Sequence, residues 1–149
     1  MAAFGTRLPG RDYVDRPSTY GIVFDAQGRV LVVEEDDEFY LPGGGLDPGE
    51  AVEAGLRREF VEETGYAIDI LGPLCDARQY AIDKASGRAW LKLCSFFRIR
   101  LVGQSAGPSI ATNHPAWVTV AEADRLLKDE AHRWALRQAL AHQNRQNTE

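Results

Sequence analysis

Five glutamates and two arginines crowd one short stretch of the chain, residues 49–65. On a helical wheel of about 100° per residue, Glu59, Glu62 and Glu63 fall within an arc of roughly 100°. The apolar residues on the same side of the wheel are Val52, Leu56 and Phe60. Glu59 and Glu63 therefore share the stripe that should face a protein core, where charged side chains are rare unless they are paired.

This clustering needs compensating positive charge. Like charges about 6 Å apart repel by roughly 3 kcal/mol per pair at an effective dielectric constant near 20. Arg58 can reach Glu62 one turn further on, but one guanidinium cannot neutralise three carboxylates and Glu50 as well. Hard carboxylate oxygens suit Mg²⁺ or Mn²⁺. On these residues alone, the alternative is an amphipathic helix whose acids fan out into solvent.

The residues around this stretch predict a helix. Asp47 is a plausible N-cap, Pro48 suits the first helical position, and Glu50 lies three residues after the cap. The helix should end near residue 64, because Gly65 is a natural residue just past a C-terminus. Gly55 lies on the acidic side, where its missing side chain leaves room beside the carboxylates.

The rest of the sequence predicts strands that could support such a helix, and then two further helices. Two apolar runs around a glycine-containing turn predict a hairpin, residues 20–25 and 29–34. Further strands are expected at 39–41, 67–74, 78–82, 90–101 and 117–120, with loops at 42–45 and 102–116. Helical spacing covers 121–128 and 129–143. This mixture without strict alternation predicts an α/β fold, a mixed sheet with helices packed on it.

The length of 149 residues suits one domain. We expect an N-terminal arm over residues 1–17, the domain over 18–143 and a frayed tail over 144–149. The net charge of -5 argues against nucleic acid as a partner. No apolar run is long enough to span a membrane, and no secretory signal is present. Two cysteines cannot form a disulfide framework, so a cytoplasmic location is expected.

The spacing of the acidic stretch is specific. It runs Gly44, five residues, Glu50, seven residues, then Arg58-Glu59-Phe60-Val61-Glu62-Glu63-Thr64-Gly65-Tyr66. This pattern resembles the signature of the Nudix hydrolases, and all seven of its fixed residues match. Tyr66 is aromatic where an aliphatic residue is commoner. The residues before the signature, and the strand and helices at the C-terminal end, also look like that family, so the resemblance covers roughly residues 18–142.

The resemblance implies a metal-dependent hydrolase that cleaves a diphosphate linked to a nucleoside, within an α/β/α sandwich around a mixed sheet. The implied ligands of Mg²⁺ (or Mn²⁺) are the carbonyl of Gly43 and the carboxylates of Glu59, Glu62 and Glu63. Arg58, paired with Glu50, would orient the glutamates. Attack by water on a diphosphate needs charge neutralisation and positioning more than a covalent nucleophile.

One departure from the family concerns the general base. Many members carry a further glutamate near the strand that holds Trp117, but residues 84–121 contain no acid. We therefore expect the base to be Glu62 or Glu63, with His114 as the alternative.

The substrate is less well indicated, and a nucleoside triphosphate, oxidised ones included, is the first expectation. Candidate phosphate contacts are Arg78, Lys84, Arg88 and Lys92, and candidate base-stacking residues are Phe39, Tyr40, Tyr80 and Trp90. The acidic run at residues 34–38 disfavours highly charged substrates. The expected partner is thus a small nucleotide diphosphate, and the protein is expected to be a monomer or a homodimer.

Two other functions remain open from the sequence. A catalytically silent nucleotide-binding or regulatory module could keep the same scaffold, although the intact signature argues against it. An isomerase of isoprenoid diphosphates shares the fold but needs a catalytic cysteine, and neither Cys75 nor Cys94 lies in a matching pattern.

Overall fold

The strands of the computed structural model, which describes residues 1–104 and 113–147, divide between two sheets. The larger sheet has the order β1-β6-β7-β2-β5, and the smaller has the order β4-β3-β8. The strands are β1 (Ala2–Phe4), β2 (Val14–Ile22), β3 (Val30–Glu35), β4 (Glu38–Tyr40), β5 (Gly43–Gly45), β6 (Tyr66–Ile82), β7 (Ala89–Gln104) and β8 (His114–Val118). The helices are α1 (Val52–Thr64), α2 (Val120–Leu126) and α3 (Glu130–Asn147).

Strand direction makes the larger sheet mixed. The long strands β6 and β7 are antiparallel, whereas β2 runs parallel to β7 and β1 parallel to β6. The short strand β5 pairs antiparallel with β2, with Tyr20 opposite Gly43 and Ser18 opposite Gly45. The smaller sheet is antiparallel throughout. This pairing places the glycine strand at an edge of the larger sheet, next to residues 18–20 of β2.

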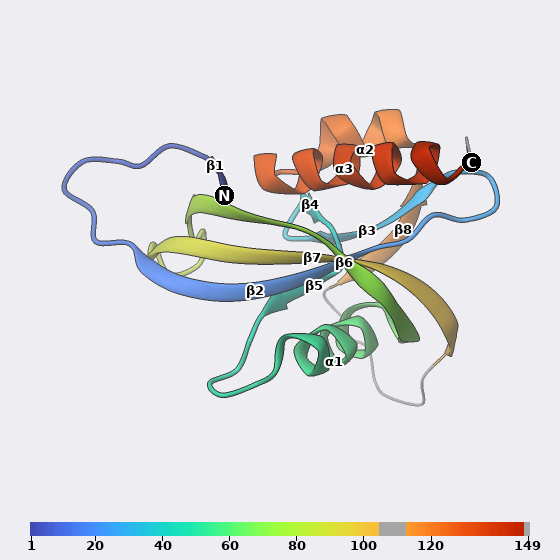
Figure 1. Ribbon diagram of the computed structural model, residues 1–149. Helices are drawn as coiled ribbons and strands as arrows, with labels where there is room; N and C mark the ends of the chain where they lie inside the picture. The colour runs from blue at the N-terminus through green and yellow to red at the C-terminus, as the bar shows by residue number, and fades with distance from the viewer. Residues whose placement is uncertain (105–112, 148–149) are drawn as a thin grey trace.

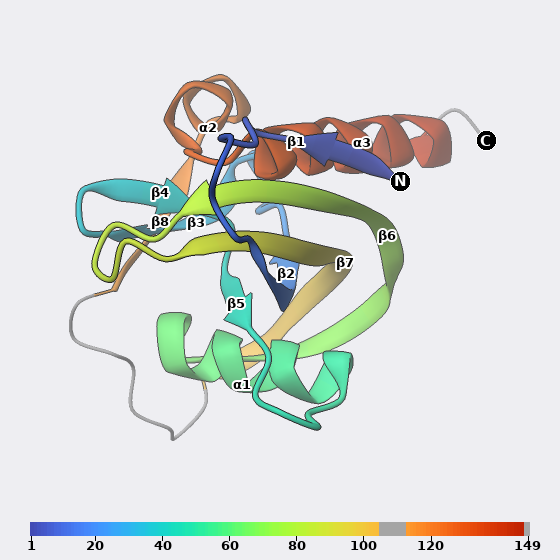
Figure 2. The same ribbon diagram turned by 90° about the vertical axis from the view of Figure 1, so that its left-hand side faces the viewer.

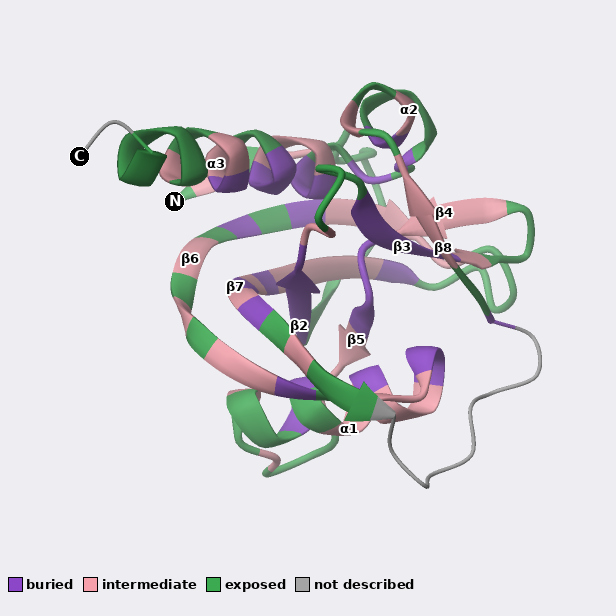
Figure 3. Cartoon of the chain, turned by 90° about the vertical axis from the view of Figure 1, so that its right-hand side faces the viewer, coloured by how far each residue is buried: buried purple, intermediate pink, exposed green. Residues whose placement is uncertain are grey.

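The helices cover the sheets from opposite sides. Figure 1 shows α2 and α3 above the sheets and α1 below them, and Figure 2 shows the same layers from the side. In Figure 3 the buried face of α3 is turned toward the sheets, and β3 is buried along most of its length. Leu56 and Phe60 of α1 are fully buried against Val23, Leu31 and Ile99. The predicted α/β/α arrangement around a mixed sheet is therefore confirmed.

The helix of the acidic stretch begins later than predicted. Its N-cap is Ala51, which makes no side-chain capping bond, so Asp47 is not the cap. Residues 47–50 form a turn instead, in which the Glu50 N–H donates to the Asp47 carbonyl and Gly49 has a φ of 77°. The predicted end was right, because Gly65 caps the helix with a left-handed φ of 76°.

The predicted hairpin over 20–25 and 29–34 is only partly formed. A backbone hydrogen bond from Asp25 to Arg29 closes its turn, but β2 and β3 then enter different sheets. Strand β3 forms its hairpin with β4 instead. Asp36 and Asp37 make the two-residue turn, and both have positive φ values, as this type of turn requires.

Several predicted boundaries are also wrong. Residues 43–45 of the expected loop form β5, and the two strands expected at 67–74 and 78–82 are one strand, β6, with irregular register. The expected loop over 102–116 overlaps the last residues of β7 and the first residues of β8. Its residues 105–112 lie outside the described part. The sequence pattern missed these pairings because they depend on partners far along the chain.

The chain ends also carry regular structure. The segment 1–17, expected to be an irregular arm, contains β1 and the first residues of β2. Phe4 packs against Trp134 of α3, with ring centroids 5.6 Å apart. Helix α3 continues to Asn147 through the expected frayed tail, whose residues 148–149 lie outside the described part. Within the described ranges, no helix combines the length and apolar character needed to cross a membrane.

Candidate active site

Arg58 holds the acidic cluster of α1 together. Its Nε and Nη2 donate to the two carboxylate oxygens of Glu50 at 2.8 and 2.9 Å. Its Nη1 donates to Glu59 at 3.2 Å and to Glu62 at 3.1 Å. Two carboxylates thus meet at one nitrogen atom, so these acids do not fan out separately into solvent. The hydrogen bonds from Arg58 lower the pKa of Glu50 to about 2.

Glu63 is the most buried acid of the cluster, with 6% of its surface exposed. Its Oε1 accepts from the backbone N–H of Gly43 at 2.7 Å, and its Oε2 accepts from Asn113 Nδ2 at 3.4 Å. Burial raises the pKa of Glu63 to about 8, and the negative charge of Glu59 adds to this effect. Burial also raises the pKa of Glu59 itself. Both carboxylates are therefore short of positive charge.

The glycine strand β5 allows the close approach of these side chains. A Cβ atom added at Gly44 would lie 2.9 Å from the carboxylate of Glu59, and one added at Gly45 would lie 2.5 Å from Arg16 Nη2. A Cβ at Gly43 would collide with the Thr19 carbonyl. Backbone alone therefore separates the acidic cluster from the side chains across the strand.

Gly55 has a different role from the one expected. A Cβ atom at this position would collide with Leu46 Cδ2 and lie 3.0 Å from Glu50 Oε1. The missing side chain makes room for the turn that precedes α1 and for the Glu50 carboxylate. It does not make room beside Glu59, Glu62 and Glu63.

The chemistry of the donor set fits a hard divalent cation. Glu59 and Glu62 share one nitrogen of the Arg58 guanidinium, whose Nε and Nη2 Glu50 already engages, and Glu63 accepts only from the Gly43 N–H and Asn113 among the described residues. Among the residues that the structure describes, no three acidic, histidine or cysteine side chains already surround one point. Glu59 and Glu62 instead accept hydrogen bonds from Arg58, while Glu63 accepts one from the backbone N–H of Gly43. A cation bound to all three carboxylates would have to replace the hydrogen bonds that Arg58 donates to Glu59 and Glu62.

A cavity of about 360 Å³ opens beside Glu63 and β5, where the two sheets meet. The larger sheet contributes Arg16 from β2 and Trp90 and Lys92 from β7. The smaller sheet contributes Glu35, Glu38 and Tyr40, and the turn between β6 and β7 contributes Lys84. The residues before α3, Lys128 and Asp129, complete the wall. A small molecule in this cavity can therefore reach Glu63, the member of the acidic cluster that lines it.

Carboxylates neutralise the three lysines that line this cavity. Glu38 accepts from Lys128 at 2.8 Å and from Lys84 at 3.3 Å, and also from the Tyr40 hydroxyl at 2.7 Å. These partners lower the pKa of Glu38 to about 2 against the opposing effect of burial. Lys92 Nζ pairs with Asp129 at 3.0 Å. The wall is thus closed by ion pairs between the two sheets and the helical layer.

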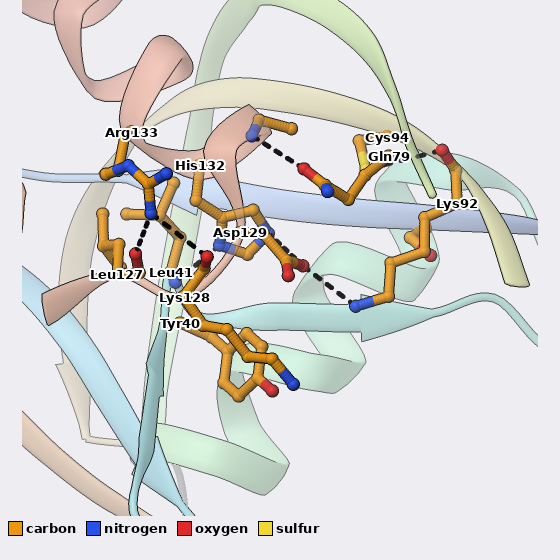
Figure 4. A network of polar contacts seen from close by, with 12 residues as sticks. Tyr40, Leu41, Gln79, Lys92, Cys94, Leu127, Lys128, Asp129, His132 and Arg133 are labelled. Atoms are coloured by element: carbon orange, nitrogen blue, oxygen red, sulfur yellow. Dashed lines mark hydrogen bonds and ion pairs between the residues drawn. The ribbon is translucent and has the colours of Figure 1, made fainter. Parts of the chain in front are cut away.

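A buried polar network supports the wall from behind (Figure 4). His132 is fully buried, and its Nδ1 accepts from the backbone N–H of Leu41 at 3.1 Å. Its Nε2 has no hydrogen-bond partner within the described residues and lies 3.9 Å from Asp129. The ring of Tyr20 packs edge-on at 4.3 Å. Burial lowers the pKa of His132 to about 4.

The predicted substrate contacts divide into two groups. Tyr40 and Lys84 line the cavity. Arg78, Tyr80 and Arg88 do not: Arg78 is exposed, Tyr80 packs edge-on against Tyr13, and Arg88 lies 5.8 Å from the Trp90 ring centroid.

The remaining candidate residues from the sequence also have defined positions relative to the cavity. Lys92 and Trp90 line the cavity, as does part of the acidic run. His114, the alternative base, is exposed on β8 and does not line it. Cys75 and Cys94 also lie outside it, and burial raises the pKa of each thiol to about 12, which argues against the isomerase alternative.

Sequence reasoning missed four residues of the site: Arg16, Asn113, Lys128 and Asp129. Arg16 fell in the segment that was expected to be an irregular arm. No spacing rule connects the other three with the acidic stretch, because the fold brings them there from distant parts of the chain.

The sequence of this chain resembles those of several known proteins. The profile of the NUDIX domain matches residues 14–142. An RNA pyrophosphohydrolase of Nitrobacter winogradskyi is 34% identical over 101 residues, which are 61% of this chain and 58% of that protein. A Bacillus subtilis protein provisionally named an 8-oxo-dGTP diphosphatase is 45% identical over 47 residues, 30% of this chain and 32% of its own. The chain spans about half the length of the curated relatives it matches.

The fold also has a counterpart among solved structures. A NUDIX hydrolase from Nitrosomonas europaea superposes with a TM-score of 0.67 at 16% sequence identity. The match covers 87% of this chain and 90% of that one. At this level of identity, the comparison supports the fold and leaves the substrate open.

Proposed function

This chain belongs to the NUDIX family, and from that premise we propose that it hydrolyses the diphosphate linkage of a nucleotide with the help of a divalent metal ion. The observation that carries the proposal is the arrangement of α1. Arg58 gathers Glu50, Glu59 and Glu62, while Glu63 lies against the glycine strand beside the cavity. The proposal is supported by Glu63, the member of this cluster that lines a cavity of nucleotide-binding size.

The carboxylates of Glu59, Glu62 and Glu63 and the carbonyl of Gly43 would hold Mg²⁺ or Mn²⁺. When bound, such an ion neutralises phosphate charge and makes a bound water more acidic. Arg58 keeps the cluster oriented through its hydrogen bonds to Glu50.

Glu62 or Glu63 would accept the proton of the attacking water. Glu63 lines the cavity, and the Glu62 side chain is 38% exposed. His114 is a weaker candidate because it lies outside the cavity.

The substrate we propose is a small nucleotide, with nucleoside triphosphates, oxidised ones included, tested first. Relatives named as an RNA pyrophosphohydrolase and as an 8-oxo-dGTP diphosphatase support this class. The relatives named for RNA also make a 5′-triphosphorylated RNA a useful member of the panel, against the expectation from net charge.

The test is a panel of nucleotides assayed for phosphate or pyrophosphate release in Mg²⁺: dATP, 8-oxo-dGTP, ADP-ribose and a 5′-triphosphorylated RNA oligonucleotide. We expect turnover of at least one of them. Glu62→Gln and Glu63→Gln should each slow that turnover at least about tenfold, because each removes a charge that holds metal or accepts a proton.

Glu53→Gln provides the matched control, because Glu53 is an exposed glutamate of the same helix. Its turnover should stay within about twofold of the wild type. Calorimetric titration with Mn²⁺ separates the alternatives. Metal binding without turnover of any substrate would favour the silent module, and absence of metal binding would refute the proposed mechanism.

A further inference from the structure

One cation in the cavity forms no ion pair with the residues that the structure describes. The cavity is lined by Arg16, Lys84, Lys92 and Lys128, and each of the three lysines forms an ion pair. Arg16 makes no ion pair or side-chain hydrogen bond to any residue in 1–104 or 113–147, and Asp83, the carboxylate of the same cavity on which its charge acts, already accepts hydrogen bonds from Ser86. Its guanidinium therefore has donors available to a ligand, whereas the lysines would have to leave Glu38 or Asp129 first.

The position of Arg16 is fixed by two neighbours that do not compete for its hydrogen bonds. The guanidinium carbon lies 4.8 Å from the ring centroid of Trp90, close enough for a cation–π interaction. On another side, Gly45 leaves the space that the guanidinium occupies, since a Cβ there would lie 2.5 Å from Arg16 Nη2. The aromatic ring and the bare backbone thus hold the side chain without neutralising it.

The glycine strand relates this cation to the acidic cluster. Added Cβ atoms at Gly44 and Gly45 would meet Glu59 and Arg16 respectively. Because successive residues of a strand face opposite sides, the Glu59 carboxylate and the guanidinium flank β5 with only its backbone between them. Glu63 lines the same cavity as Arg16, so a molecule that places one phosphate near Glu63 can place a neighbouring anionic group near Arg16.

We propose that Arg16, held by Trp90 and Gly45, binds a second phosphate group of the substrate, adjacent to the phosphate that lies at the carboxylates. This inference deepens and rests on the proposed function. It assigns a residue of β2 to the second phosphate of the diphosphate linkage. Guanidinium suits this task because it donates two parallel hydrogen bonds to phosphate oxygens.

The experiment measures binding separately from turnover. The probe is the α,β-methylene analogue of ATP in Mg²⁺, titrated into the full chain by calorimetry. Arg16→Gln should weaken its binding about tenfold or more, the loss expected for a charged hydrogen-bonded contact. Arg16→Lys keeps the positive charge without the paired donors. Its affinity for the probe should lie between those of the wild type and Arg16→Gln.

Arg88→Gln is the matched control. Arg88 also lies over the Trp90 ring, at 5.8 Å, but it does not line the cavity. Its removal should leave binding within about twofold of the wild type. Thermal melting of each variant checks that the fold is retained.

Equal affinities for the wild type and Arg16→Gln would overturn the inference, as would absence of binding to the wild type. The two proposals fail in different ways. If Glu63→Gln abolishes turnover while Arg16→Gln binds normally, the hydrolase proposal stands and the Arg16 subsite fails. If no substrate is turned over but Arg16→Gln loses the probe, the subsite stands and the hydrolase proposal fails.

Discussion

At the scale of single residues, the geometry of Arg58 distinguishes a site from a merely acidic helix. A guanidinium has a planar fork that can grip one carboxylate with two donors and still offer a third to others. Arg58 uses this fork on Glu50 and reaches Glu59 and Glu62 with Nη1. Its neighbour Arg57 is exposed, so two adjacent arginines have very different surroundings.

This contrast supports a prediction. Arg58→Lys should lower kcat/KM about tenfold or more, because an ammonium group cannot hold Glu50 with two parallel bonds while spanning Glu59 and Glu62. Arg57→Lys makes the same chemical change on the exposed side and should leave kcat/KM within about twofold. Steady-state kinetics on the substrate found by the panel measures both. Equal losses in the two variants would show that Arg58 has no special role in orienting the acids.

At the scale of elements, the site depends on how closely α1 packs against β2. Gly21 of β2 lies under the ring of Phe60, and a Cβ atom there would lie 2.6 Å from Phe60 Cε2 and 3.1 Å from Ile99 Cγ1. Phe60 is fully buried, so its ring has little room to move. The helix that carries the acids is therefore positioned by a glycine in the strand beneath it.

Gly21→Ala should accordingly destabilise the protein by about 1–3 kcal/mol, the usual cost of overpacking a core. Gly72→Ala is the control, because the added Cβ would meet Arg98 Nη2 at 2.9 Å, the end of a flexible side chain that can move away. That change should cost less than about 1 kcal/mol. Urea unfolding of both variants gives the free energies, and similar values would contradict the proposed tight packing of Phe60.

The same scale shows what the sequence could predict. The spacing of Glu59, Glu62 and Glu63 encodes their place on one side of a helix, so the local cluster and its family could be identified from the chain alone. The division of strands between two sheets could not, because β2 finds its partners in β7 and β5 through long-range pairing. Arg16 was missed for this reason: its place in the cavity depends on that pairing and on Trp90.

At the scale of the whole molecule, buried ionisable groups link the cavity wall to the pH dependence of stability. His132 is fully buried below the wall, and burial lowers its pKa to about 4 despite the attraction of Asp129. In the unfolded chain a histidine has a pKa of about 6.5. Above that pH His132 is neutral in both the folded and the unfolded state, so it does not change the free energy of unfolding with pH. As the pH falls from 6.5 toward 4, the unfolded chain takes up a proton that the folded protein does not.

The contribution of His132 to the free energy of unfolding should therefore fall over this pH range, by on the order of 3 kcal/mol. His132→Gln removes that contribution while keeping an acceptor for the Leu41 N–H, so its stability should depend less on pH between 6.5 and 4. His142→Gln is the matched histidine control. Urea unfolding at a series of pH values measures the three proteins. Parallel curves for the wild type and His132→Gln would contradict the assignment.

The strand of three glycines also bears on how the specificity of this protein could evolve. A larger residue at Gly43 would collide with the Thr19 carbonyl, and larger residues at Gly44 and Gly45 would displace the side chains of Glu59 and Arg16. Substitutions at residues 43–45 would disturb these neighbouring groups, so they are poor positions for adding a contact to a different substrate. Diversification has to come from the facing wall, where Tyr40 on β4 and Trp90 and Lys92 on β7 line the cavity. Directed-evolution libraries should be randomised at those three positions and leave residues 43–45 unchanged.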